Sequence, residues 1–225
     1  MKRSEINKNI REAFHFFTKN NFLLPTWAGY TVSEWKQYQP SAKEIFENQL
    51  GWDITDFATH DFEKVGLTLF TIRNGNPNLK NYTKTYAEKI MMVKVNQLTP
   101  MHFHWKKMED IINRAGGKLC LQLWKADQEE KLSNESFSVQ IDGMKKQVSA
   151  GEIVVLNPGE SITLEPFVYH KFWAEGEVCM IGEVSQVNDD NTDNRFLEPL
   201  GRFPEIEEDE APFLLLCNEY KKLFT

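Results

Sequence analysis

The first fifty residues carry apolar side chains at helical spacing. A helix is predicted over residues 4–19 (SEINKNIREAFHFFTK), behind Ser4, which is a good N-cap residue. A second helix is predicted over 41–50, where Ser41 and Glu44 form a capping-box pattern. The apolar positions of the first helix are Ile6, Ile10, Ala13, Phe14 and Phe17.

From about residue 64 the apolar pattern changes to a period of two, which is typical of β-strands. Strands are predicted over 65–73, 85–96, 118–125, 135–141, 152–156, 161–165 and 177–185. Turn dipeptides separate several of them: Gly116-Gly117, Asp142-Gly143 and Pro158-Gly159. Many short strands at this spacing predict an all-β sandwich, barrel or jelly roll.

The pattern divides the 225-residue chain into three segments of one structural domain. Residues 1–63 form a helical segment that packs on the β-rich part, and residues 64–185 form that part. Residues 186–225 are acidic at first and interrupted by proline. We expect them to form an ordered wrap or lid before a short final helix.

Composition and charge limit the classes of partner. The net charge of −7, from 33 acidic against 26 basic residues, disfavours nucleic acid. The N-terminus has no unbroken apolar run of the kind a signal peptide needs, and no membrane span is apparent. The odd cysteine count predicts small core residues in a reducing compartment. A soluble, cytoplasmic protein with a small-molecule ligand is expected.

Two histidines occupy alternate positions of a strand-like segment, Pro100–His104. Because side chains alternate along a strand, His102 and His104 project to the same face, where both imidazoles can meet one metal ion. Glu109 needs a turn before it to join them. His170 lies in another strand-like segment between apolar blocks.

These residues resemble the cupin superfamily. HxHx4E followed by six residues and Gly, which is the first cupin motif, matches His102, His104, Glu109 and Gly116. His170 fits the histidine of the second motif, although Phe167 stands where the family usually has glycine. The resemblance implies a cupin jelly-roll β-barrel with N-terminal helices, an extended C-terminal segment and a metal site of three histidines and Glu109. The other two histidines, His15 and His60, are interpreted as structural.

A narrower resemblance covers nearly the whole chain. The segments PMHFHWKKMEDIINRAGG, GLTLFTIRNG, KTYAEKIM, GEVSQVNDDNTDNRF and GRFPEIEEDEAP are similar to bacterial D-lyxose ketol-isomerases of the cupin type. That family implies interconversion of D-lyxose and D-xylulose, often of D-mannose and D-fructose, with Mn²⁺. Mixed imidazole and carboxylate ligands suit Co²⁺, Fe²⁺, Ni²⁺ and Zn²⁺ as well. The apolar strands and helices are also compatible with a homodimer.

Isomerising an aldose requires an acid or base near C1 and C2 of the sugar. Glu109 is one candidate, if it leaves the metal in part. Among the acids of the C-terminal segment, Glu207 is the first choice for a carboxylate that enters the barrel mouth, and Glu205, Glu208 and Asp193 are alternatives.

Three residues are candidates for contact with the sugar. Lys89 is a charge within an apolar strand, and if it faces inward it can bind a hydroxyl or polarise the carbonyl. The alternation around it does not settle which face is buried. Trp173 can pack its ring against the sugar. The Asp193 carboxylate can accept hydrogen bonds from the hydroxyl groups of the sugar.

Two other functions remain open at this point. An iron-dependent cupin dioxygenase uses the same four ligands, and the ligands alone do not exclude it. A non-catalytic sugar-binding cupin would hold the same ligand without exchanging the C2 hydrogen for solvent hydrogen.

Overall fold

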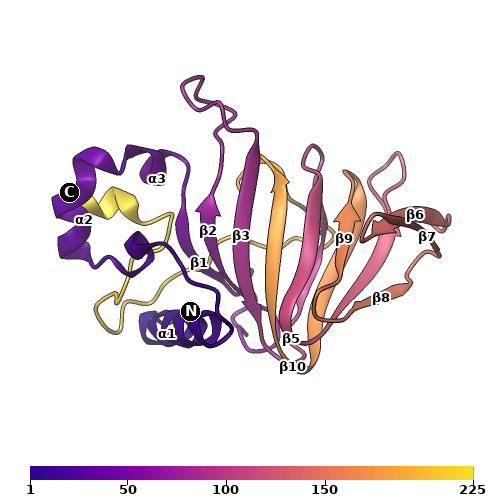
Figure 1. The fold of residues 1–225 in the computed structure, drawn as a ribbon, viewed down its shortest axis with the longest axis horizontal. Coiled ribbons are helices and arrows are strands. Elements are labelled where there is room, and N and C mark those ends of the chain that lie inside the picture. The colour runs from indigo at the N-terminus through magenta and orange to yellow at the C-terminus, as the bar shows by residue number, and fades with distance from the viewer. Residues whose placement is uncertain (225) are drawn as a thin grey trace.

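A computed structural model describes residues 1–224 and gives a β-rich fold with helices at one end (Figure 1). The α-helices are α1 (Arg3–Lys19), α2 (Val32–Tyr38) and α3 (Lys43–Glu47), and short 3-10 helices are η1 (Thr26–Gly29), η2 (Gln39–Ser41) and η3 (Tyr220–Leu223). The strands are β1 (Gly51–Thr55), β2 (Leu67–Arg73), β3 (Tyr86–Val93), β4 (Thr99–Phe103), β5 (Glu109–Lys125), β6 (Phe137–Ile141), β7 (Met144–Val148), β8 (Ile153–Leu156), β9 (Ser161–Leu164), β10 (Val168–Gln186) and β11 (Arg195–Phe196).

The strands form one antiparallel sheet in the order β1-β2-β3-β10-β5-β9-β6-β7, with β8 paired to β5 and β4 paired to β10 and β11. Its inner face carries a continuous apolar cluster that includes Leu69, Met91, Leu121, Leu164 and Ile181. The predicted all-β cupin barrel with N-terminal helices and an extended C-terminal segment is confirmed.

Helix α1 covers the outer face of the first strands. Ile6, Ile10 and Phe17 of α1 pack with Trp52 of β1 and Phe70 of β2 in a second apolar cluster. Strands β2 and β3 are therefore buried on both faces. The segment 1–63, predicted to be helical, also contributes strand β1, which pairs with β2 and extends the barrel sheet. None of the helices in residues 1–224 is long and apolar enough to cross a membrane.

The predicted helix ends need correction. Helix α1 begins one residue earlier than predicted, and Ser4 lies inside it with its hydroxyl donating to Asp209. The second helix spans only Lys43–Glu47, because Ser41 ends η2 and its hydroxyl donates to a backbone carbonyl. The capping box is at Thr31, at the start of α2.

Gly116-Gly117 is not the turn that the sequence predicts. Strand β5 continues through both residues and bulges against β10. A Cβ on Gly116 would lie 1.9 Å from the Val178 carbonyl oxygen, so glycine is required here by close approach of the two strands. The hairpin at Asp142-Gly143, between β6 and β7, is confirmed.

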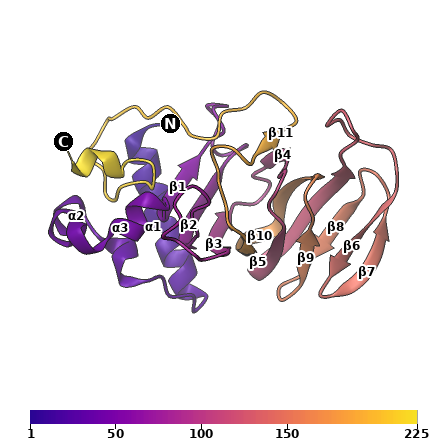
Figure 2. The ribbon, with the colours of Figure 1, turned by 90° about the horizontal axis from the view of Figure 1, so that it is seen from above.

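The C-terminal segment connects the barrel mouth to the helical end. After β10 it adds β11 beside β4 and then returns to the helices, where both termini lie (Figure 2). It ends in η3, which packs with Trp35 and Ala42 in a third apolar cluster. The segment thus packs on the barrel at β11 and on the helical end at η3.

Candidate metal centre and active site

Strands β4 and β10 bring three histidines together. His102 and His170 are register partners on these adjacent strands, and His104 follows the end of β4. All three are buried, and ligand nitrogens of the three rings lie within 4.8 Å of one another. The predicted same-face arrangement of His102 and His104 therefore holds.

Hydrogen bonds to the backbone fix the tautomer of each ring. The Nδ1 atoms of His102, His104 and His170 lie 2.8, 2.6 and 3.0 Å from backbone carbonyl oxygens. A carbonyl only accepts, so each Nδ1 carries a hydrogen, and in the neutral form of each ring Nε2 presents its lone pair. The accepting residues are Pro100, Asp193 and Val168.

Glu109, the first residue of β5, completes the group after the predicted turn. Its Oε1 lies 3.4 Å from His104 Nε2 and 3.2 Å from His170 Nε2, and it is buried without a hydrogen-bond donor. Acceptors that face each other at this distance repel unless a cation lies among them. The donor set therefore fits a divalent metal ion.

The protonation states agree with this fit. Burial, followed by the neighbouring imidazoles, lowers the pKa of His102 well below its ordinary value, so its ring is neutral at pH 7. Burial alone would raise the pKa of Glu109, but the Lys107 ammonium outweighs it and holds the pKa well below the usual range. Neutral imidazole and ionised carboxylate are the forms that bind metals.

A chain of buried charges continues from Glu109. Lys107 Nζ lies 2.8 Å from Glu109 Oε2 and 2.9 Å from Glu183 Oε1. Lys89 Nζ lies 3.6 Å from both Glu183 Oε1 and Asp190 Oδ2. Burial acts to raise the pKa of Glu183, and Lys107 and Lys89 outweigh it, so the carboxyl is ionised.

Arg202, from the C-terminal segment, closes this chain. Its Nη2 lies 2.6 Å from Asp53 Oδ2 and 3.2 Å from Asp190 Oδ2. Its Nη1 is buried without a partner in residues 1–224, and Arg202 lines the cavity that holds the metal group. A donor is thus left for a ligand oxygen. Burial works to raise the pKa of Asp190, but Arg202 and Lys89 lower it well below its ordinary value.

The structure brings only some of the predicted sugar contacts to this cavity. Lys89 faces inward and lines it, as do the four candidate metal ligands. Asp193 does not: its Oδ1 accepts hydrogen bonds from the backbone of Trp105 and Lys106, and its Oδ2 from that of Lys107, each at 3.0 Å. Asp193 thus anchors the β4–β5 loop, and its carboxylate is already used.

Glu207 and Trp173 lie elsewhere. Glu207 is exposed and bridges to Lys2 beside the N-terminus, since the segment has already left the mouth at that point. Glu205 bonds the N-terminal amine through its carbonyl, and Glu208 pairs with Arg3. Trp173 is three positions after His170 and so points out of the barrel, where it donates to Glu175.

Sequence reasoning missed several charged residues of the cavity. Glu183 stands two positions after Ile181 on the inner face of β10. A charged residue at a position where the strand pattern expects an apolar one, as at Lys89, was the sequence signal that could have identified it. Lys107 and Arg202 lie in loops, where no periodicity marks a side chain as inward. The remaining histidines, His15 and His60, are exposed and outside the cluster.

Comparison with known proteins shows which family the whole chain resembles. A family model described as D-lyxose isomerase matches residues 1–220. Proteins named D-lyxose/D-mannose isomerase from Escherichia coli O157:H7 and Serratia proteamaculans are each 49% identical to the chain, covering 99% and 98% of both chains respectively.

Solved structures with the same fold include L-ribose isomerases. The enzyme of Acinetobacter sp. DL28 in complex with L-ribose matches with a TM-score of 0.63 at 15% identity, covering 92% of this chain and 98% of that one. The enzyme of Cellulomonas parahominis with L-psicose matches with a TM-score of 0.61 at 13% identity, with the same coverage. At these identities the likeness concerns the fold.

Proposed function

The chain belongs to the D-lyxose isomerase family, and we propose that it interconverts D-lyxose with D-xylulose and D-mannose with D-fructose. It is an aldose-ketose isomerase. The observation that carries the substrate proposal is a buried group of three imidazoles and one carboxylate, beside ionised side chains in a single cavity. The names of the two close relatives support the choice of sugars.

We propose His102, His104, His170 and Glu109 as the ligands of a divalent ion, with Mn²⁺ as the first choice. Such an ion supplies positive charge that stabilises a sugar oxygen as it becomes negative. The chain's own part is to keep the three Nε2 atoms converged through the backbone hydrogen bonds at Nδ1, and the Glu109 carboxylate in place through its ion pair with Lys107.

Glu183 is the proposed proton-transfer residue, in place of Glu207. Its carboxylate is ionised, buried and on the cavity wall, so it can take the proton from C2 of the aldose and return it to C1, while the hydroxyl proton passes from O2 to O1. The Lys107 ammonium group forms ion pairs with both Glu183 and Glu109. It thereby sets the distance between the proton-transfer carboxylate and the metal ligands.

Lys89 and Arg202 are proposed to bind sugar oxygens. Both line the cavity and are held by Asp190, and Arg202 has an unbonded Nη1. A buried donor without a partner favours a ligand that supplies an acceptor, such as a hydroxyl oxygen.

The decisive experiment follows proton exchange and ketose formation together. Mn²⁺-loaded protein is incubated without oxygen in heavy water with D-lyxose or D-mannose. We expect ketose with solvent deuterium at C1, and loss of activity with a chelator that Mn²⁺ restores. Turnover that requires oxygen and iron would indicate a dioxygenase, and sugar binding without hydrogen exchange would indicate a non-catalytic module.

The metal ligands have a direct test. His102→Ala should abolish stoichiometric Mn²⁺ binding, measured by elemental analysis, along with activity. His60→Ala is the matched control, because His60 is exposed and outside the cluster. Full metal content in the His102→Ala protein would reject the ligand assignment.

We also propose a cytoplasmic location. All three cysteines are buried and unpaired, which supports a reducing compartment. The predicted homodimer stays a prediction, to be measured by light scattering.

A further inference from the structure

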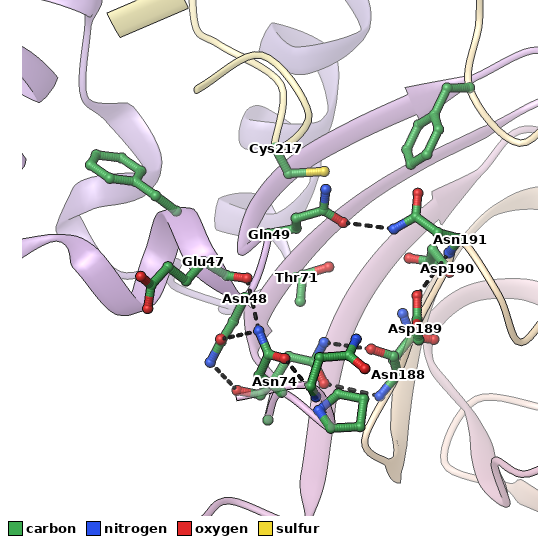
Figure 3. A pocket seen from close by; sticks show the side chains of 16 residues that line it. Glu47, Asn48, Gln49, Thr71, Asn74, Asn188, Asp189, Asp190, Asn191 and Cys217 are labelled. Carbon is green, nitrogen blue, oxygen red and sulfur yellow. Dashed lines mark hydrogen bonds between the residues drawn. The ribbon is translucent and has the colours of Figure 1, made fainter. Parts of the chain in front are cut away.

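A second cavity of about 260 Å³ lies beside the catalytic one (Figure 3). The end of α3 with residues 48–49, and the loops 74–78 and 188–191, line it. We call it the amide pocket after the asparagine and glutamine side chains that these segments contribute. The two cavities share Asp190. Thr71 of the amide pocket is the register partner of Lys89, so they are neighbours across one pair of strands.

Hydrogen bonds between the loops fix the walls of the amide pocket. Asn74 Nδ2 donates to the backbone carbonyl of Asn188 at 2.8 Å, and the backbone N–H of Asn188 donates to Asn74 Oδ1 at 3.0 Å. Asn48 Nδ2 donates to the Asn74 carbonyl at 3.1 Å, and Asn76 Nδ2 to Asn48 Oδ1 at the same distance. The pocket is therefore preformed, which lowers the entropic cost of binding.

Hydrogen-bonding groups remain unused on these walls. Thr71 is only 4% exposed, and its hydroxyl makes no hydrogen bond within residues 1–224. In Figure 3 it lies below the bond that joins Asn191 Nδ2 to Gln49 Oε1 at 3.3 Å. That bond leaves the Gln49 amino group and the Asn191 oxygen for a ligand.

The charges around the amide pocket restrict the ligand class. Carboxylates of Glu47, Asp189 and Asp190 line it, and none of its described lining residues is Lys or Arg, so an anion is disfavoured. Each of these carboxylates has a hydrogen-bonding or ionic partner, and within residues 1–224 they do not form a group of three ligand atoms close enough to hold a metal ion. The partners are Tyr82, Thr192 and Arg202, respectively.

We propose that the amide pocket is a second, non-catalytic binding site for a neutral polyhydroxylated molecule, a free sugar or sugar alcohol. Hydroxyl groups both donate and accept, which matches the unused Thr71, Gln49 and Asn191 groups. Phe46 and Phe203 also border the pocket, with the Phe46 ring packed on Trp35 and Tyr220 and the Phe203 ring under the Arg202 guanidinium. The volume lies below the range of about 300–1,000 Å³ of larger ligand sites, so one sugar unit fits best.

The test measures xylitol binding to the full-length, metal-free protein by calorimetry. The wild-type protein should bind xylitol, and Thr71→Val, which replaces the hydroxyl by a methyl group of the same shape, should weaken binding about fivefold, the value of one hydrogen bond. Thr68→Val is the matched control: Thr68 lies on the same strand, its buried hydroxyl is also unpartnered, and it does not line the amide pocket.

A second variant tests the same site by occlusion. Asn191→Trp, at an exposed position of the wall, should abolish xylitol binding while isomerase activity persists. Equal affinities for wild-type, Thr71→Val and Asn191→Trp proteins, or no binding to the wild-type protein, would overturn the proposal. Because the titration needs neither metal nor turnover, its outcome is separate from that of the isomerase proposal.

Discussion

Glu183 is the residue on which the proposed proton transfer depends. Glu183→Gln keeps the shape of the side chain and removes its ability to take a proton. We expect the rate of C2 hydrogen exchange to fall about 100-fold or more, the usual contribution of a general base. Bound Mn²⁺ should remain, because Glu183 is not among the proposed ligands.

Glu207→Gln is the matched control for this change. Glu207 is exposed beside the N-terminus, so its substitution should leave exchange unchanged. Normal exchange in the Glu183→Gln protein, measured by nuclear magnetic resonance in heavy water, would remove Glu183 from the mechanism.

Lys89 shows where single residues limit prediction from sequence. The alternation in β3 sets Ala87, Lys89, Met91 and Val93 against Ile90 and its neighbours, and both sets are apolar because α1 covers the outer face of the sheet. The alternation argument assumes that one face of the strand is exposed to solvent. It therefore could not decide whether the Lys89 side chain points into the barrel or out of it. The position of a helix far away along the chain decides it.

At the scale of elements, the turn before β10 carries a conformational strain. Phe167 has φ of 63°, in the left-handed region where the cupin family usually has glycine. A side chain costs about 1–2 kcal/mol in that region. Phe167 offsets part of this by packing its ring 5.3 Å from that of Phe103.

This strain predicts an unusual order of stability between two variants. Both Phe167→Ala and Phe167→Gly lose the ring, but only glycine relieves the left-handed strain. Phe167→Gly should therefore be more stable than Phe167→Ala by about 1 kcal/mol in urea unfolding. In an ordinary strand a glycine variant is less stable than an alanine variant. If Phe167→Gly is less stable than Phe167→Ala, position 167 carries no left-handed strain.

Elements with local causes were predictable, and those with distant causes were not. The β6–β7 hairpin follows from Asp142-Gly143 alone, and the histidine pair follows from strand alternation. Gly116 was interpreted as a turn because its need for glycine comes from Val178 of another strand. The exit of the C-terminal segment from the mouth before Glu207 likewise depends on its pairing with the N-terminus.

At the scale of the whole molecule, Arg3 joins the two ends of the chain. This fully buried side chain donates to Glu208 at 2.7 and 2.8 Å and to Glu219 at 3.0 Å. Hydrogen bonds from Arg3 lower the pKa of Glu208 to about 2. Because the folded-state pKa is lowered, the stabilisation is present above the unfolded pKa and is lost as the pH falls toward 2.

Arg3→Met should therefore lower stability at pH 7 and flatten its decline below pH 4.5. The neutral-pH loss is expected to be about 3 kcal/mol, because Glu219 stays buried without its main partner. Lys8→Met is the matched control on α1, since Lys8 forms only an exposed pair with Glu12. Urea unfolding between pH 2 and 7 measures both, and parallel pH profiles for Arg3→Met and wild type would contradict the assignment.

Asp193 couples the C-terminal segment to the metal ligands. Its carbonyl accepts from His104 Nδ1, and its carboxylate holds the backbone of the loop between His104 and Glu109. A metal ion that fixes His104 should thereby fix the segment 188–203 as well. Hydrogen exchange of that segment should slow when Mn²⁺ binds to the wild-type protein.

Asp193→Asn removes one acceptor oxygen and places an amino group against backbone N–H groups. Mn²⁺ affinity should fall about 10- to 100-fold, as for other groups that orient metal ligands, and the metal-induced protection of residues 188–203 should shrink with it. Asp189→Asn is the control, because within residues 1–224 the Asp189 side chain bonds to its own loop, at Asn191 and Thr192. If both variants bind Mn²⁺ like the wild type, the segment covers the barrel mouth without supporting the ligands, and the two parts of the molecule are energetically independent.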